Sequence, residues 1–272
     1  MKELTMTTPR RTTPYDEKIP LDLWIEFPRA DLRRRLIEAV LTIARLRGAT
    51  SLDLQEALCA AWNVSPVGSA FSRLARDLAH YDLAYFTIQR IAGKQKITLF
   101  RLTERGRTLA RLLGVEPIEN GWDTLVHTHQ GETQVTHAAL LLYADRLARE
   151  RDWLTELTPD ESHQLFYPDL WISTGEWSMY VEVESRWRAH SHQWDKWRAA
   201  LRVQGFAAIV ARTSAVRARL VQGCRAAGVP GVATDLETLR LREEQWWLEV
   251  WHTSAASVKT WAFIQKMVKP IH

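Results

Sequence analysis

The chain has 272 residues, of which 46% are apolar and 25% are charged, a composition that is typical of folded proteins and excludes a disordered or fibrous chain. Because domains commonly hold roughly 100 to 200 residues, the length predicts two domains. The formal net charge is only +4, but arginine far outnumbers lysine. Its planar, bidentate contacts to phosphate favour a nucleic-acid partner.

The N-terminal segment carries no targeting signal that we recognise. Its first residues, MKELTMTTPRRTTPYDEK, contain no apolar run, and the whole chain lacks an uncharged apolar stretch of about 18 residues. We therefore expect a cytoplasmic protein that has no membrane partner. Residues 1–29 are rich in Thr, Pro and charge, which predicts a flexible arm.

Residues 30–115 begin with a helical pattern. Apolar side chains recur at helical spacing in three successive segments, which predicts three helices: one that starts at Asp31 and is followed by Gly48, one from Ser51 to Asn63, and one that starts at Ser65-Pro66 and carries Leu78. Ser51 is predicted to cap the second helix, and Asn63 to end it.

A hairpin and a further helix follow. Apolar and polar residues alternate over 83–91 and again over 96–102, on either side of a turn, which predicts two antiparallel strands. Thr103 then caps a helix that ends near Gly114. Three helices, a two-stranded wing and a closing helix are the order of a winged helix-turn-helix domain, and the stretch FRLTERGRTLARLLG resembles the exit from the wing in that superfamily.

The third predicted helix and the wing tip are the candidate DNA contacts. In a helix-turn-helix the outer face of this helix enters the major groove, where arginine pairs with guanine edges or phosphate and serine bonds a phosphate. That face holds Ser69, Ser72, Arg73 and Arg76. Lys94 and Lys96 flank the wing tip and are expected to reach the DNA backbone or minor groove. The alternative is that these residues are ordinary solvated charges on a protein-docking module.

Residues 122–242 predict a second domain built on a mixed sheet. A long helix, a strand, an antiparallel hairpin, a crossover helix and further strands follow in order: residues 133–151, 153–157, 168–172, 177–184, 190–203, 206–211, 214–227 and 229–233. Residues 243–272 form a Trp-rich extension. Its run around Trp246, Trp247 and Trp251 predicts either an edge strand or a surface that docks a partner or a second copy.

Three acidic side chains are expected to meet on the hairpin of this second domain. Because side chains alternate across a strand, Glu182 and Glu184 share one face, and a four-residue turn places Asp169 beside Glu182. Three carboxylates on one surface repel each other unless a cation lies among them, and oxygen ligands suit Mg²⁺ or Mn²⁺. The alternative is that Glu182 and Glu184 are the solvated face of an edge hairpin.

The arrangement resembles the PD-(D/E)xK nuclease superfamily. Pro168-Asp169, a hairpin and Glu182-Val183-Glu184 stand where that family has a Pro-Asp and an acid, any residue and lysine. The resemblance implies a restriction-endonuclease-like domain in which Asp169 and Glu182 hold the metal. Glu184 departs from the family pattern, because it stands where the lysine is expected. Lys196 on the following helix, or Arg186 further along the strand, could supply the positive charge instead.

The order of parts resembles the replication-relaxation family of plasmid and mobile-element proteins, over about residues 30 to 240. That family joins a winged helix to a degenerate nuclease-like fold, which implies double-stranded DNA as the partner. The expected function is therefore DNA binding with metal-dependent phosphodiester cleavage or nicking, with Asp169, Glu182, Glu184 and Lys196 as the catalytic residues. The alternative is a non-catalytic regulator or assembly factor that uses the nuclease-like fold as a scaffold.

Overall fold

The computed structural model describes residues 29–63, 69–92, 95–128, 135–159, 166–187, 191–239, 245–254 and 256–268. It divides the chain into two compact units. The first extends to Thr87 and includes Thr98–Asn120, and the second comprises Ile88–Ile97 and the chain from Gly121 onward. Residues 1–28 of the expected arm lie outside the described residues.

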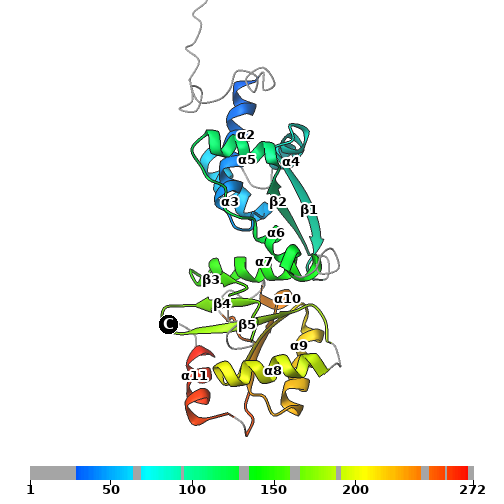
Figure 1. Cartoon of the computed structure of the whole chain (residues 1–272), viewed down its shortest axis with the longest axis vertical. Coiled ribbons are helices and arrows are strands. Elements are labelled where there is room, and N and C mark those ends of the chain that lie inside the picture. Colours follow the sequence, from blue (N-terminus) through cyan, green and yellow to red (C-terminus); the bar gives the residue numbers. More distant parts are fainter. Residues whose placement is uncertain are drawn as a thin grey trace, which may run out of the picture. The chain divides into compact units, whose positions relative to one another are not determined.

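The elements up to residue 112 are helices and one antiparallel hairpin, in the predicted order (Figure 1). They are α2 (Ala30–Arg45), α3 (Ser51–Trp62), α4 (Ser69–His80), β1 (Ala84–Arg90), β2 (Lys96–Leu102) and α5 (Glu104–Leu112). The apolar stripes of these helices form one core, to which Leu36, Val40, Leu54 and Phe100 each contribute a side chain that is at most 2% exposed. The three-four periodicity of the sequence therefore has the expected physical cause, the burial of one helical face.

The start of α3 differs from its prediction by one residue. Thr50, and not Ser51, is the N-cap: its hydroxyl accepts a hydrogen bond from Asp53 N, and the Asp53 carboxylate accepts one from Thr50 N at 2.9 Å. Only Thr50 has an acid three residues later, so only Thr50 can close this reciprocal pair. Asn63 ends the helix in the left-handed conformation, with a φ of 53°, as predicted.

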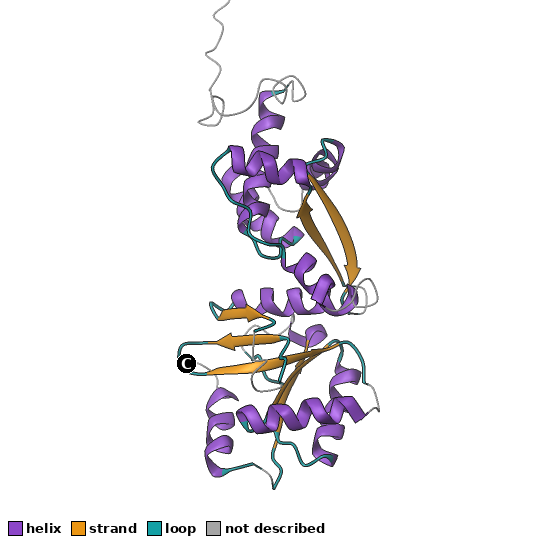
Figure 2. Cartoon of the chain, viewed as in Figure 1, coloured by secondary structure: helices purple, strands orange, loops and turns teal. Residues whose placement is uncertain are grey.

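The second unit contains a mixed sheet and helices (Figure 2). Its elements are α6 (Gly121–Thr128), α7 (Val135–Arg149), β3 (Leu154–Leu157), β4 (Leu170–Ser173), β5 (Ser178–Glu184), α8 (Ser191–Gln204), β6 (Ala207–Ala211), α9 (Ser214–Ala226), β7 (Gly231–Asp235), α10 (Leu236–Leu239), β8 (Glu249–Trp251) and α11 (Val258–Val268). Helix α6 was not predicted from the sequence, because eight residues are too few for a periodic pattern to stand out.

The strands of this sheet lie in the order β3-β4-β5-β6-β7-β8 among the described residues. The three inner strands β5, β6 and β7 are parallel, whereas β3, β4 and β8 run antiparallel to their neighbours. Helices α8 and α9 pack against the face that carries Ile209, and α7 packs against β3, β4 and β5. The predicted mixed sheet is confirmed, and its parallel strands are covered by helices as such strands require.

The Trp-rich segment completes the sheet as an edge strand. Trp246, Trp247 and Trp251 are at most 4% exposed, and Trp251 Nε1 donates a hydrogen bond of 2.7 Å to the Val229 carbonyl oxygen. A Cβ at Gly231 would collide with the Ala207 carbonyl oxygen of β6 and with the Trp251 ring, so the glycine leaves room for both. Of the two predictions for this segment, the edge strand is confirmed. Within the described part of the chain, no helix is long and apolar enough to cross a membrane.

Candidate nuclease-like site

The hairpin register brings two acids together at one point of the sheet. Leu170 pairs with Val181, so one step further along the antiparallel ladder Asp169 lies across from Glu182, as predicted. β5 lies between β4 and β6, and Glu182 is only 1% exposed. The alternative of a solvated edge hairpin is therefore wrong for Glu182. β6 pairs with the edge of β5, and α8 covers the face that carries Glu182.

Lys196 lies among the three acids. Its side chain extends from α8 and forms an ion pair with Glu182; its Nζ lies 3.2 Å from Glu184 Oε1 and 3.6 Å from Asp169 Oδ2. Arg186, the other candidate for the missing positive charge, is exposed. We call Asp169, Glu182, Glu184 and Lys196 the acid-lysine cluster. The structure thus brings together the four residues predicted from the sequence as catalytic.

A fifth residue, His137, belongs to the same site and was not predicted. It lies in the first turn of α7, and its Nε2 is 3.1 Å from Asp169 Oδ1. The other oxygen of Asp169 accepts a hydrogen bond of 2.8 Å from Val183 N. The sequence contains no spacing signal for His137, because its contact depends on how α7 packs against the sheet, across 32 positions of the chain.

The charges of the cluster drive the pKa values of its two buried acids apart. Burial alone would raise the pKa of Asp169, but the charges of Lys196 and His137 lower it below its usual range. Burial raises the pKa of Glu182 well above its ordinary value, an effect that Lys196 opposes and the charge of Asp169 increases. Such a split is typical of carboxylates that have different roles in one site.

The two basic side chains respond to the same acids. Burial would lower the pKa of Lys196, but the three carboxylates raise it well above its ordinary value. Burial would likewise lower the pKa of His137, and the charge of Asp169 together with its hydrogen bond raises it. Both shifts favour the positively charged forms, so the cluster provides part of its own neutralising charge.

The donor set of the cluster suits a hard divalent cation. Glu182 Oε1 is buried and has no hydrogen-bond partner in the described part of the chain, and carboxylate oxygens are the ligands that Mg²⁺ and Mn²⁺ prefer. No group of three His, Cys, Asp or Glu side chains among the described residues forms a ready-made metal cage. The carboxylates are therefore suitable ligands for such a metal, and Lys196 Nζ lies at the point where they converge.

The candidate DNA contacts are described in part. On α4, Arg73 and Arg76 are exposed while Leu74 and Leu78 are buried, which is the amphipathic arrangement that the sequence predicted. Lys96 is exposed at the start of β2. The side chains of Ser69 and Ser72, and the whole of Lys94, lie outside the described residues.

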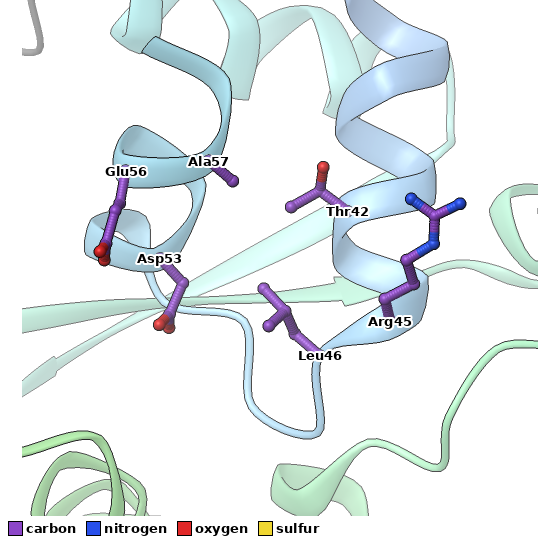
Figure 3. Close-up of a pocket in the computed structure, with 6 residues that line it drawn as sticks. All are labelled: Thr42, Arg45, Leu46, Asp53, Glu56 and Ala57. Atoms are coloured by element: carbon purple, nitrogen blue, oxygen red, sulfur yellow. The ribbon is translucent and has the colours of Figure 1, made fainter. Parts of the chain in front are cut away.

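A separate pocket of about 370 Å³ lies between α2 and α3 in the first unit (Figure 3). Figure 3 shows its lining residues, Thr42, Arg45, Leu46, Asp53, Glu56 and Ala57. The Asp53 carboxylate is already engaged by the backbone and hydroxyl of Thr50. The pocket shares no residue with the acid-lysine cluster.

Comparison of the chain with protein-family models, with curated proteins and with solved structures found no match. The resemblances to the PD-(D/E)xK superfamily and to the replication-relaxation family therefore stay predictions that rest on the residues quoted for them.

Proposed function

We propose that the protein binds double-stranded DNA through its winged-helix-like N-terminal elements, α2 to α5, and cleaves or nicks it at a metal-dependent, nuclease-like site in the second unit. The observation that carries the proposal is the convergence of Asp169, Glu182 and Glu184 on Lys196 at the carboxyl end of β5. Ligand sites in sheets with parallel strands commonly lie at the carboxyl ends of those strands. The setting that the family resemblance implies is a plasmid or another mobile element.

Each member of the cluster has a role in phosphodiester hydrolysis. Asp169 and Glu182 would hold Mg²⁺ or Mn²⁺, which would polarise the phosphate and lower the pKa of a water molecule. Glu184, the more exposed acid, would be a third ligand or would polarise the attacking water. Lys196 Nζ stabilises the negative charge that grows on the phosphate oxygens as water adds and one P–O ester bond breaks.

DNA binding is assigned to the exposed basic residues of α4 and the hairpin. Arg73 and Arg76 supply two positive charges on one exposed helix face, and Lys96 a third on β2. Neutralising phosphates by such groups releases counterions and provides sequence-independent affinity. The same face of a recognition helix can also contact base edges.

A plasmid-nicking assay with Mn²⁺ tests the catalytic part of the proposal. Wild type is expected to convert supercoiled plasmid to the nicked or linear form, and Asp169→Ala to lose that activity. Asp195→Asn is the matched control, because Asp195 lies on α8 next to Lys196 in the sequence but is 68% exposed. Its activity should equal that of wild type.

The second candidate function is a non-catalytic DNA-binding regulator or assembly factor. One observation favours it: Lys196 already neutralises part of the acidic charge, so the cluster has an architectural use even if no metal binds. Equal nicking by wild type and Asp169→Ala, or no nicking by either, would support this function over cleavage.

A further inference from the structure

Asp169 is held by groups from separate elements of the second unit. Its Oδ1 lies 3.1 Å from His137 Nε2 on α7, and its Oδ2 accepts a hydrogen bond of 2.8 Å from Val183 N on β5. The same Oδ2 faces Lys196 of α8 at 3.6 Å. Asp169 is 5% exposed, so both of its oxygens are fixed from inside the protein.

The contact between His137 and Asp169 has a defined direction. An ionised carboxylate can only accept hydrogen bonds, so Nε2 is the donor and carries the hydrogen. His137 is partly buried, with a side chain that is 15% exposed, and its donor nitrogen is turned to Asp169. This is the geometry of a group that orients a ligand and does not itself bind the ion through Nε2.

We propose that His137 is a positioning residue that sets the rotation of the Asp169 carboxylate for the divalent ion. The inference rests on the proposed function, because it takes Asp169 as a metal ligand. Hydrogen-bond partners of ligating carboxylates fix their orientation, and loss of such a partner typically weakens metal binding about 10- to 100-fold. Val183 N holds one oxygen of Asp169, and His137 holds the other. The contact with His137 thus prevents the carboxylate from rotating about its Cβ–Cγ bond.

The test measures Mn²⁺ binding by calorimetry and by electron paramagnetic resonance on the full chain. His137→Ala should raise the Kd for Mn²⁺ about 10- to 100-fold. His137→Gln should stay close to wild type, because the glutamine amide offers a donor near the position of Nε2. His80→Ala, which removes an exposed histidine at the end of α4, is the control and should bind as wild type does.

A thermal melt of each variant separates positioning from folding. If His137→Ala unfolds, the His137→Gln variant still tests the inference. Equal Kd values for wild type and His137→Ala would overturn the inference, and so would a His137→Gln variant that folds but binds as weakly as His137→Ala. A direct nitrogen coupling from His137 to Mn²⁺ would also overturn it, because His137 would then be a ligand.

The outcomes distinguish this inference from the proposed function. Failure of wild type to bind Mn²⁺ would overturn both. Binding by wild type with no effect of His137 would overturn the inference alone. The expected Kd values without any DNA cleavage would support the inference and overturn the nuclease.

Discussion

Lys196 is the internal counterion of three carboxylates. Like charges a few ångströms apart repel strongly when water is excluded, and Glu182 and Asp169 are at most 5% exposed. Lys196 lies within ion-pair distance of all three acids. Because removing one partner of a buried ion pair leaves uncompensated charge, the cost of losing the lysine is large.

We expect Lys196→Met to lower the free energy of unfolding at pH 7 by about 3 to 5 kcal/mol. A divalent cation should replace the missing charge, so Ca²⁺ should raise the Tm of this variant more than that of wild type. Thermal melts with and without Ca²⁺ measure both effects. Lys266→Met, at a 57% exposed lysine that pairs with Glu176, is the control and should melt close to wild type in both conditions.

Because the pKa of Glu182 is raised, replacing this residue by its neutral isostere glutamine is expected to stabilise the protein, by an amount that depends on pH. Because burial raises the pKa of Glu182, the folded protein holds this proton in a pH range where the unfolded chain, with a glutamate pKa of about 4.3, has lost it. The contribution of Glu182 to wild-type stability therefore falls as the pH rises from about 4.3 through its folded pKa.

Glu182→Gln should accordingly melt at a higher temperature than wild type at pH 7, with a difference that shrinks toward pH 4. Denaturation curves at several pH values provide the measurement, and Glu176→Gln, at an acid that is 73% exposed, is the control. A difference that does not change with pH would contradict the prediction. The same variant should lose Mn²⁺-dependent nicking, as expected of a residue whose burial costs stability for function.

At the scale of single elements, the sequence predicted what depends on local periodicity. The two-residue period of β5 placed Glu182 and Glu184 on one face, and the hairpin register brought Asp169 across from Glu182. Both features follow from residues close in the chain.

Contacts between distant segments could not be predicted in the same way. Burial of Glu182 depends on the pairing of β5 with β6 beyond the intervening helix, and the contact of Lys196 depends on the rotation of α8. His137 acts from a helix that precedes the hairpin, so no motif spacing connects it to Asp169.

The exposed face of α4 predicts how salt affects DNA binding. We expect Arg73→Ala/Arg76→Ala to weaken binding to duplex DNA and to reduce the slope of log K against log salt by about 2, if each arginine neutralises one phosphate. Fluorescence anisotropy across salt concentrations measures both. Arg34→Ala/Arg219→Ala removes the same charge from exposed positions on other helices and should leave the slope unchanged. An unchanged slope for the α4 variant would favour a protein-docking role.

At the scale of the whole molecule, the two units are proposed to do separable work. The candidate DNA contacts Arg73 and Arg76 lie in the first unit, whereas Asp169 and the rest of the acid-lysine cluster lie in the second. A defect in DNA binding should therefore leave Mn²⁺ binding intact, and a defect in the acid-lysine cluster should leave DNA binding intact.

We expect Arg73→Ala/Arg76→Ala to bind Mn²⁺ as wild type does but to nick poorly at roughly 0.15 M salt, with partial recovery at lower salt, where electrostatic binding strengthens. Asp169→Ala should bind duplex DNA normally and fail to nick at any salt concentration. Parallel anisotropy, calorimetry and nicking assays check this pattern. Loss of both duplex binding and Mn²⁺ binding in either variant, with an unchanged Tm, would show that the units do not act separately.

The antiparallel pairing of β8 with β7 has a consequence for biosynthesis. In chain order β8 follows all the other strands of its sheet, so a nascent chain on the ribosome can assemble Asp169, Glu182 and Lys196 while one side of β7 still has no neighbour. An open strand edge attracts other chains, and partly synthesised domains are prone to such association. Formation of β8, which ends at Trp251, thus closes the exposed edge of β7 in a sheet that already carries the assembled acid-lysine cluster.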